Sequence, residues 1–156
     1  MALGCNLPAA YTSREALLEA ALEAFPSEGL AVVAQSSWWT SAAWPDPAGP
    51  AYLNGVAVVE TSLDAAGALA ALHRIEARFG RARGELNASR TLDLDLIAHG
   101  RSVISDGVML PHPRAHERLF VMGPLAEIAP DWRHPVSGET AARLADAASV
   151  GRDARP

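Results

Sequence analysis

The chain has 156 residues, of which 49% are hydrophobic and 20% charged, and its formal net charge at pH 7 is -5. This size and balance predict one domain with a real core and exclude wholesale disorder. The acidic balance argues against a bulk nucleic-acid surface. The single Cys5 excludes an internal disulfide framework and a cysteine zinc site.

The basic residues are all arginine, 13 in total. The absence of lysine excludes a Walker A phosphate loop, Schiff-base chemistry and a kinase-type lysine. Any phosphate that binds here must therefore be held by arginine and metal, and the planar fork of arginine suits that role. No stretch is long and apolar enough to span a membrane, and the start is not a signal peptide, so we expect a cytoplasmic protein that binds no membrane.

The first half of the chain predicts two strands and a helix. Met1 to Cys5 is a short apolar start that fits a strand, and Cys5 itself is expected to be a small packed residue. Thr12 or Ser13 can cap a helix that runs to about Phe25, because leucines follow at helical spacing. Residues 30–39 are typical of a strand, and residues 40–51 form a proline-rich loop.

The second half repeats this pattern and then departs from it. Residues 52–61 predict a strand, and 62–79 an amphipathic helix that ends at Gly80. A polar loop over 81–89 leads into a strand over 90–97. The elements that we expect beyond this strand are a hairpin around Asp106-Gly107, a helix over 115–128 that Gly123-Pro124 should kink or divide, a short helix to about residue 149, and a frayed tail from about 150 to 156.

The order of these elements, β-α-β-β-α-β with additions, predicts an α+β fold of the ferredoxin-like plan. In that plan helices pack on one antiparallel sheet. We expect residues 1–156 to form a single domain, because no internal repeat or second composition is visible.

The strand over 90–97 carries the strongest chemical signal. Leu92, Leu94 and Leu96 alternate with Asp93 and Asp95, so the leucines can enter a core while both carboxylates share the other face. Two residues of rise place the carboxylates about 6.5 Å apart at the backbone. Their repulsion is relieved by a hard cation such as Mg²⁺, and Arg90 could hold an anion beside it. The alternative is a solvated strand face.

Three other groups of polar residues are weak signals alone and indicate a binding site only through their positions in the chain. Tyr52 and Asn54 share a strand face and offer a ring and an amide to a flat heterocycle, although surface residues commonly look the same. The loop before the Asp pair and its exit contain Arg81, Arg83 and Arg90, although a run of charge in a loop is commonly solvated. Prolines surround His112, so the i,i+4 helical spacing to His116 does not hold, and anion contact is favoured over a metal pair; the alternative is a capped loop that leads into a helix.

Together these motifs resemble the 6-hydroxymethyl-7,8-dihydropterin pyrophosphokinase family of folate biosynthesis. The resemblance runs from Gly4 to about Thr140, and its specific parts are R-T-L-D-L-D at 90–95 and P-H-P-R at 111–114. It implies transfer of pyrophosphate from ATP to the hydroxymethyl group of the pterin, which leaves AMP. The partners implied are ATP and the pterin, with two Mg²⁺ ions as cofactors, no nucleic acid, and a monomeric protein.

The resemblance also implies roles for individual residues. Asp93 and Asp95 would bind the metal ions and count as catalytic, together with Arg81 and Arg90. The ATP-binding residues would be Glu76, Arg83, Arg90, Leu96, His112 and Arg118. The pterin-binding residues would be Ser41, Ala42, Trp44, Tyr52, Asn54 and Phe120, with Tyr52 and Phe120 sandwiching the ring.

The chain departs from the family pattern at several places. Cys5 replaces a serine, and the first strand looks shorter than usual, which suggests a misassigned start or a clipped strand. Asn87 replaces a loop tryptophan, so a stacking lid there should be weaker. Gly107 and Met109 stand where an arginine and a threonine are common.

Two other functions compete with the enzyme. One is a non-catalytic ferredoxin-like module that binds a small ligand or a partner. The other is a magnesium-dependent nuclease, which the acidic balance disfavours. The intact Asp93, Asp95, Arg90 and His112 favour the enzyme.

Overall fold

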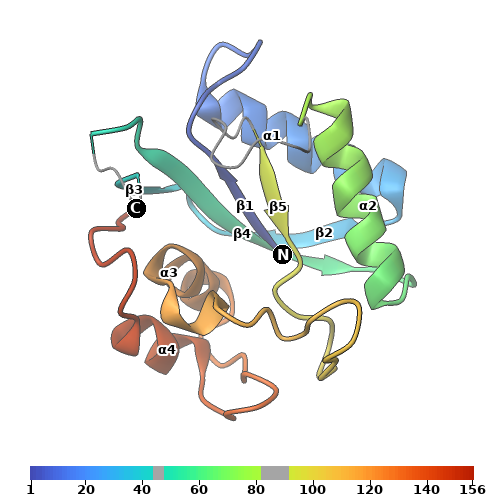
Figure 1. The fold of residues 1–156 in the computed structure, drawn as a ribbon, viewed down its shortest axis with the longest axis vertical. Coiled ribbons are helices and arrows are strands. Elements are labelled where there is room, and N and C mark those ends of the chain that lie inside the picture. The colour runs from blue at the N-terminus through green and yellow to red at the C-terminus, as the bar shows by residue number, and fades with distance from the viewer. Residues whose placement is uncertain (44–47, 82–91) are drawn as a thin grey trace.

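The computed structural model shows one antiparallel sheet between two layers of helices (Figure 1). It describes residues 1–43, 48–81 and 92–156. Among the residues singled out by the sequence, Trp44, Arg83, Asn87 and Arg90 lie outside the described residues. Parts of the loops expected over 40–51 and 81–89 lie there as well.

The order of elements confirms the α+β prediction. The five strands are β1 Ala2–Cys5, β2 Ala31–Gln35, β3 Trp39–Ser41, β4 Tyr52–Glu60 and β5 Asp93–Asp95. The helices are α1 Arg14–Ala24, α2 Ala65–Arg78, α3 Leu119–Ile128 and α4 Ala141–Ala147, with 3-10 turns η1 Phe25–Glu28 and η2 Ala115–Glu117.

The strands lie in the order β2-β4-β1-β5, all antiparallel, which is the ferredoxin-like arrangement. The stretch expected as one strand over 30–39 is divided into β2 and β3, and both pair with β4. A register shift between Val32 and Ala34 bends β2 before the chain reaches β3. The hairpin expected at Asp106-Gly107 is present, because Ile104 and Leu110 exchange both backbone hydrogen bonds.

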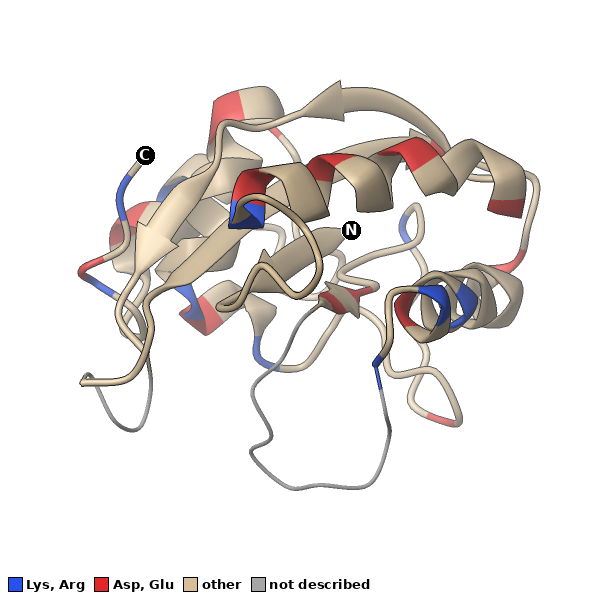
Figure 2. Ribbon diagram, turned by 90° about the horizontal axis from the view of Figure 1, so that it is seen from above, with Lys and Arg blue, Asp and Glu red and all other residues tan. Residues whose placement is uncertain are grey.

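The two helices of the ferredoxin-like core begin at the predicted caps. The Ser13 side chain accepts a hydrogen bond from Ala16 N, and the Asp64 side chain accepts one from Gly67 N. Each bond satisfies an otherwise unpaired amide in the first helical turn. Figure 2 shows acidic and basic residues along these helices, and Arg74 Nε of α2 pairs with Glu28 Oε2 at 2.7 Å.

The two faces of the sheet build separate cores because strand side chains alternate. On one face, Leu3, Leu53 and Leu94 pack beneath α1 and α2. On the other face, Val56 and Ile97 pack beneath α3 and α4. Among the described residues no helix combines the length and the apolar character needed to cross a bilayer.

The break in the helix expected over 115–128 is not at Gly123-Pro124. The chain makes the short turn η2, becomes extended at Arg118, and then forms α3 with Pro124 inside it. Pro124 is buried, and a Cβ on Gly123 would come within 2.6 Å of the Trp39 ring. Close packing against β3 therefore holds these residues in a helix despite their low propensity.

The expectation of a frayed tail is wrong. Ala154 is 8% exposed, and Thr40 and Arg155 exchange two backbone hydrogen bonds of 2.8 and 3.1 Å. Figure 1 shows the end of the chain beside β3. The tail is ordered by an edge strand that lies more than 100 residues earlier, so local composition gives no sign of it.

Candidate active site

The register of the sheet aligns polar residues from distant parts of the chain. Gly4 of β1 pairs with Asp93 of β5 on one side and with Asn54 of β4 on the other, and Asn54 pairs with Trp39 of β3. Paired residues point to the same face, which here is the face beneath α3. Asp93, Gly4, Asn54 and Trp39 thus form one row across four strands.

Gly4 keeps the middle of this row open. Asn54 and Asp93 are separated by two strand spacings, or about 10 Å. A Cβ on Gly4 would lie 3.4 Å from Asn54 Oδ1, so any larger side chain would cover the amide. The row therefore has a carboxylate end and an aromatic end with free surface between them. The carboxylate end comprises Glu76, Arg81, Asp93, Asp95 and His112, and the aromatic end comprises Trp39, Ser41, Tyr52, Asn54 and Phe120.

The two aspartates lie as the alternation predicts. Leu92, Leu94 and Leu96 are at most 5% exposed in the core, while Asp93 and Asp95 are half-buried on the opposite face. Burial raises the pKa of Asp95 above its ordinary value, and the charge of Asp93 raises it further. The site is therefore built so that two negative charges are unfavourable without a cation.

Arg81 supplies one such cation. Its Nη1 lies 2.5 Å from Asp93 Oδ1 and also pairs with Glu76 Oε1. Glu76 is 2% exposed, and its Oε1 accepts a hydrogen bond of 2.8 Å from Leu94 N of β5. Burial raises the pKa of Glu76, and the Leu94 bond and the charge of Arg81 oppose that shift. Glu76 thus anchors β5 and Arg81 to α2, and its contact with ATP stays a prediction.

His112 and Arg118 complete the electrostatic surroundings of Asp95. The charges of both lower the pKa of Asp95, and burial lowers the pKa of His112. The backbone N–H of His112 donates to Ile97 O at 2.8 Å, and the ring Nδ1 of His112 accepts from the backbone N–H of Arg114. The guanidinium of Arg118 also lies 5.7 Å from the centroid of the Phe120 ring, so it reaches toward the aromatic end.

The carboxylate end fits a magnesium ion that shares its coordination with phosphate. The described residues contain no group of three or more histidine, cysteine, aspartate or glutamate side chains arranged to hold a metal. Mg²⁺ is commonly held by only one or two carboxylates, with phosphate oxygens and water as the other ligands. Asp93 and Asp95 can supply that pair, and the raised pKa of Asp95 is the charge strain that such an ion would relieve.

The aromatic end is held together by hydrogen bonds to Asn54. Its Nδ2 donates to Ser41 Oγ at 3.0 Å and lies 3.4 Å from Trp39 O, so β3 and β4 are locked side to side. Tyr52 pairs with Ser41 in register and is half-buried on the same face. Phe120 approaches this face from the first turn of α3.

Glu127 and Trp39 are part of this arrangement and were missed by the sequence reasoning. The Glu127 carboxylate accepts from Trp39 Nε1 at 2.8 Å, from Ser37 Oγ at 2.8 Å and from Ser37 N at 3.0 Å. These bonds tie the end of α3 to β3, while the Trp39 ring lies on Gly123. Glu127 lies within the stretch that the resemblance covers, but nothing in the local sequence indicates partners about 90 residues away.

Two residues expected at the site lie differently from the others. The Leu96 side chain is 5% exposed in the core beneath α1 and α2, so it faces away from Asp95. Ala42 follows β3 and is exposed, and its N–H donates to Asp153 of the tail. Cys5 is fully buried, and burial raises the pKa of its thiol to about 12, as befits a packed residue.

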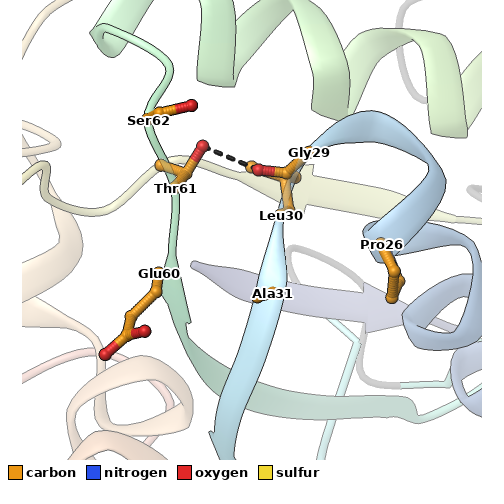
Figure 3. Close-up of a pocket in the computed structure, with 7 residues that line it drawn as sticks. All are labelled: Pro26, Gly29, Leu30, Ala31, Glu60, Thr61 and Ser62. Carbon is orange, nitrogen blue, oxygen red and sulfur yellow. Dashed lines mark hydrogen bonds between the residues drawn. The ribbon is translucent and has the colours of Figure 1, made fainter.

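Two hollows that the described residues line are away from the row. Figure 3 shows one between η1 and the end of β4, where Thr61 Oγ1 already donates to Gly29 O at 2.8 Å. The other is an apolar cavity of about 330 Å³ between the Met1 end of the sheet and α3, bordered by Val56, Leu125 and Trp132. Neither contains a residue of the carboxylate end, so the chemistry of the chain points to the row.

Comparison with known proteins agrees with this site. The sequence model of the 7,8-dihydro-6-hydroxymethylpterin-pyrophosphokinase family matches residues 1–130. A 2-amino-4-hydroxy-6-hydroxymethyldihydropteridine pyrophosphokinase of Synechocystis sp. is 43% identical over 144 residues, covering 91% of this chain and 71% of that protein. Proteins of the same name from Pseudomonas aeruginosa and Methylorubrum extorquens are 39% and 35% identical, covering 86% and 90% of this chain and 82% and 86% of their own lengths. The chain belongs to the 7,8-dihydro-6-hydroxymethylpterin-pyrophosphokinase family.

Proposed function

We propose that this chain transfers the pyrophosphoryl group of ATP to the hydroxymethyl group of 6-hydroxymethyl-7,8-dihydropterin, a step of folate biosynthesis. The observation that carries the proposal is the row from Asp93 through Gly4 to Asn54. It brings a carboxylate pair suited to metal and phosphate onto the same open face as an amide and aromatic rings suited to a flat heterocycle. Family membership supplies the identity of the two substrates.

In the proposed reaction the hydroxymethyl oxygen attacks the β-phosphorus of ATP. The bond between that phosphorus and the oxygen bridging to the α-phosphate breaks, AMP leaves with the bridging oxygen, and the hydroxyl proton is released. Such transfers need positioning and charge neutralisation more than covalent help from the protein. A chain without lysine can therefore perform this chemistry with arginines and carboxylates.

At the carboxylate end we assign Asp93 and Asp95 to two Mg²⁺ ions. Bound magnesium would neutralise the triphosphate and polarise its phosphorus–oxygen bonds. Arg81, held between Glu76 and Asp93, is placed to turn from the carboxylates to phosphate oxygens once metal occupies the aspartates. His112 and Arg118 would contact ATP beside Asp95, as would Arg83 and Arg90, which lie outside the described residues.

At the aromatic end we assign Tyr52 and Phe120 to the two faces of the pterin and Asn54 to its edge. Tyr52 and Asn54 share the face beneath α3, and Phe120 lies on that helix. Asn54 Nδ2 already donates to Ser41 Oγ, which leaves Oδ1 directed over Gly4 as an acceptor. We infer that Ser41 serves the pterin mainly by fixing this orientation.

The test is to incubate the protein with ATP, Mg²⁺ and the hydroxymethyl pterin, and to separate nucleotides by chromatography. We expect AMP and pterin diphosphate in equal amounts, and no AMP when the pterin or Mg²⁺ is omitted. ADP as the sole product would show an ordinary kinase and overturn the proposal. No nucleotide turnover, with retained binding of the pterin, would favour the non-catalytic module.

A further inference from the structure

We propose that the C-terminal strap, defined as residues 149–155, is part of the pterin-binding apparatus and positions both Phe120 and the backbone after β3. This inference rests on the proposed function, because it concerns the residues assigned there to the pterin. The strap lies beyond residues 1–130, which the family model matches.

The strap first seats itself at the start of α3. Ser149 N and Val150 N donate to Glu117 O at 3.1 and 2.9 Å, and Val150 O accepts from Leu119 N at 2.9 Å. Leu119 is the first residue of α3, and no side chain caps that helix. The strap thus takes over the role of a helix cap and fixes the turn that presents Phe120.

Gly151 then brings the strap against the Phe120 ring. A Cβ on Gly151 would lie 2.4 Å from Phe120 Cδ1, closer than real Cβ contacts, and 3.0 Å from Cε1, so the ring would have to shift. The φ of Gly151 is +68°, a conformation that disfavours side chains in any case. Only glycine lets the ring rest here, so the strap supports the side of Phe120 and limits where the ring can move.

The strap finally crosses to β3. Ala154 N donates to Gly151 O at 3.0 Å and turns the chain, and Arg155 then exchanges two backbone hydrogen bonds with Thr40. Within this turn, Asp153 Oδ2 accepts a hydrogen bond of 2.5 Å from the N–H of Ala42, the residue that follows Ser41. One short segment therefore holds both the helix turn with Phe120 and the backbone beside Ser41.

The consequence is a positioning role that affects one substrate. Val150 of the strap pairs with Arg118, but among the bonds described Gly151 and Asp153 contact neither Arg118 nor the two aspartates, so changes at Gly151 and Asp153 should alter pterin binding and spare ATP binding. Gly151→Ala should raise the KM for the pterin about three- to tenfold, the range that an aromatic contact contributes. Asp153→Ala should raise it about threefold through loss of one hydrogen bond.

The controls are chosen within the chain. Gly138→Ala carries a similar backbone strain, with φ +74°, but its Cβ meets nothing within 4 Å, so it separates strain from contact with Phe120. Asp153→Asn keeps an acceptor for Ala42 N and should restore the wild-type KM.

The experiment is steady-state kinetics on the full chain, varying the pterin and ATP separately, with the melting temperature of each variant recorded. A raised KM for the pterin with an unchanged KM for ATP in Gly151→Ala and Asp153→Ala, and not in the controls, supports the inference. Equal changes for both substrates, or wild-type constants in both variants, overturn it while leaving the proposed function intact. If Gly151→Ala does not fold, the exposed Asp153→Ala decides alone. An inactive wild type would overturn the proposed function and this inference with it.

Discussion

The carboxylate end and the aromatic end share one sheet face but are held together by different forces. At the carboxylate end, two aspartates two residues apart repel each other, and Arg81, which buried Glu76 also holds, supplies a positive charge beside Asp93. At the aromatic end, neutral rings and amides are fixed by hydrogen bonds between β3, α3 and the strap.

The two ends should therefore respond differently to substrate binding. Charged groups close to one another respond to a cation, so the carboxylate end should reorganise when metal and ATP bind. Packed rings tied by several hydrogen bonds have few alternative arrangements, so the aromatic end should be nearly preformed.

Asp95→Ala should abolish most activity while the protein still folds. The variant loses a proposed metal ligand, and we expect turnover to fall by about 100- to 1000-fold, the scale at which preorganised charge acts in catalysis. Because burial and Asp93 raise the pKa of Asp95, removing its carboxylate relieves repulsion, and the melting temperature without Mg²⁺ should not fall.

Turnover and thermal melting with and without Mg²⁺ check this prediction. Asp146→Ala, which removes an exposed carboxylate from α4, is the matched control and should behave as wild type. Wild-type turnover in Asp95→Ala would refute its metal role. A large loss of stability would instead show that Asp95 is structural.

Glu76→Ala should affect stability more than ATP binding. The change leaves the N–H of Leu94 without its partner and Arg81 with one carboxylate fewer, so we expect a loss of about 2–4 kcal/mol in the free energy of unfolding. Glu76→Gln keeps the shape and the acceptor and should cost less than about 1.5 kcal/mol. Burial raises the pKa of Glu76, so removing the charge alone should be well tolerated.

Urea unfolding measures both variants, and the KM for ATP in Glu76→Gln separates two roles. An unchanged KM for ATP supports Glu76 as an anchor of β5 and Arg81. A KM for ATP raised tenfold or more, with stability retained, would return Glu76 to direct contact with the nucleotide.

The contrast between the two ends also explains what the sequence could predict. Asp93 and Asp95 are two residues apart on one strand, so their common face followed from alternation, and the capped helices α1 and α2 followed from local spacing. The resemblance then supplied the substrates. At the aromatic end, by contrast, the partners of Glu127 and Asp153 are about 90 and 111 residues away. No local pattern carries such a pairing.

Two departures from the prediction have the same origin. Gly123-Pro124 were expected to kink or divide a helix and the residues after 150 were expected to fray, and both expectations rest on intrinsic propensity. Trp39 packing on Gly123 and Thr40 pairing with Arg155 override that propensity. The burial of Glu76, by contrast, was predictable from local sequence. Glu76 shares a face of α2 with the apolar residues Leu72 and Ile75.

Glu127→Ala should weaken pterin binding and leave ATP binding unchanged. The variant frees Trp39 Nε1 and both donors of Ser37, so β3 loses its tie to α3. We expect the KM for the pterin to rise about three- to tenfold, equivalent to one or two lost hydrogen bonds to a charged group. Glu127→Gln retains one acceptor and should show a smaller change.

Separate substrate titrations check Glu127→Ala, and hydrogen exchange at Trp39 to Ser41 shows whether β3 has loosened. Exchange that stays as slow as in wild type, together with an unchanged KM for the pterin, would mean that the strap and Asn54 suffice to hold β3. The aromatic end would then be less dependent on α3 than we infer.

The smallest expected effect is a dependence of stability on pH that arises at His134, in the segment that carries α4 and the strap. His134 is 8% exposed, and its Nδ1 accepts from Val136 N and Ser137 N, so the proton resides on Nε2. Burial lowers the pKa of His134 below its ordinary value, His116 lowers it further, and Glu139 opposes. A second proton would require Nδ1 to give up both amide hydrogens.

The sign follows from where the proton binds. Below about pH 6.5, the ordinary histidine value, the unfolded chain takes up a proton that the folded chain refuses, so stability falls as the pH drops toward the lowered pKa. Above that value His134 adds no pH dependence.

His134→Asn offers Oδ1 to the same two amides and cannot titrate, so its stability should fall less than that of wild type between about pH 7.5 and pH 5.5. Urea unfolding at both pH values provides the comparison, and because the carboxylates titrate alike in both proteins, the difference in slope isolates His134. Equal slopes would show that the imidazole is free to protonate in the folded chain. His134 lies in the segment that supports the aromatic end and not the carboxylate end. The KM for ATP should therefore change with pH in the same way in wild type and in His134→Asn.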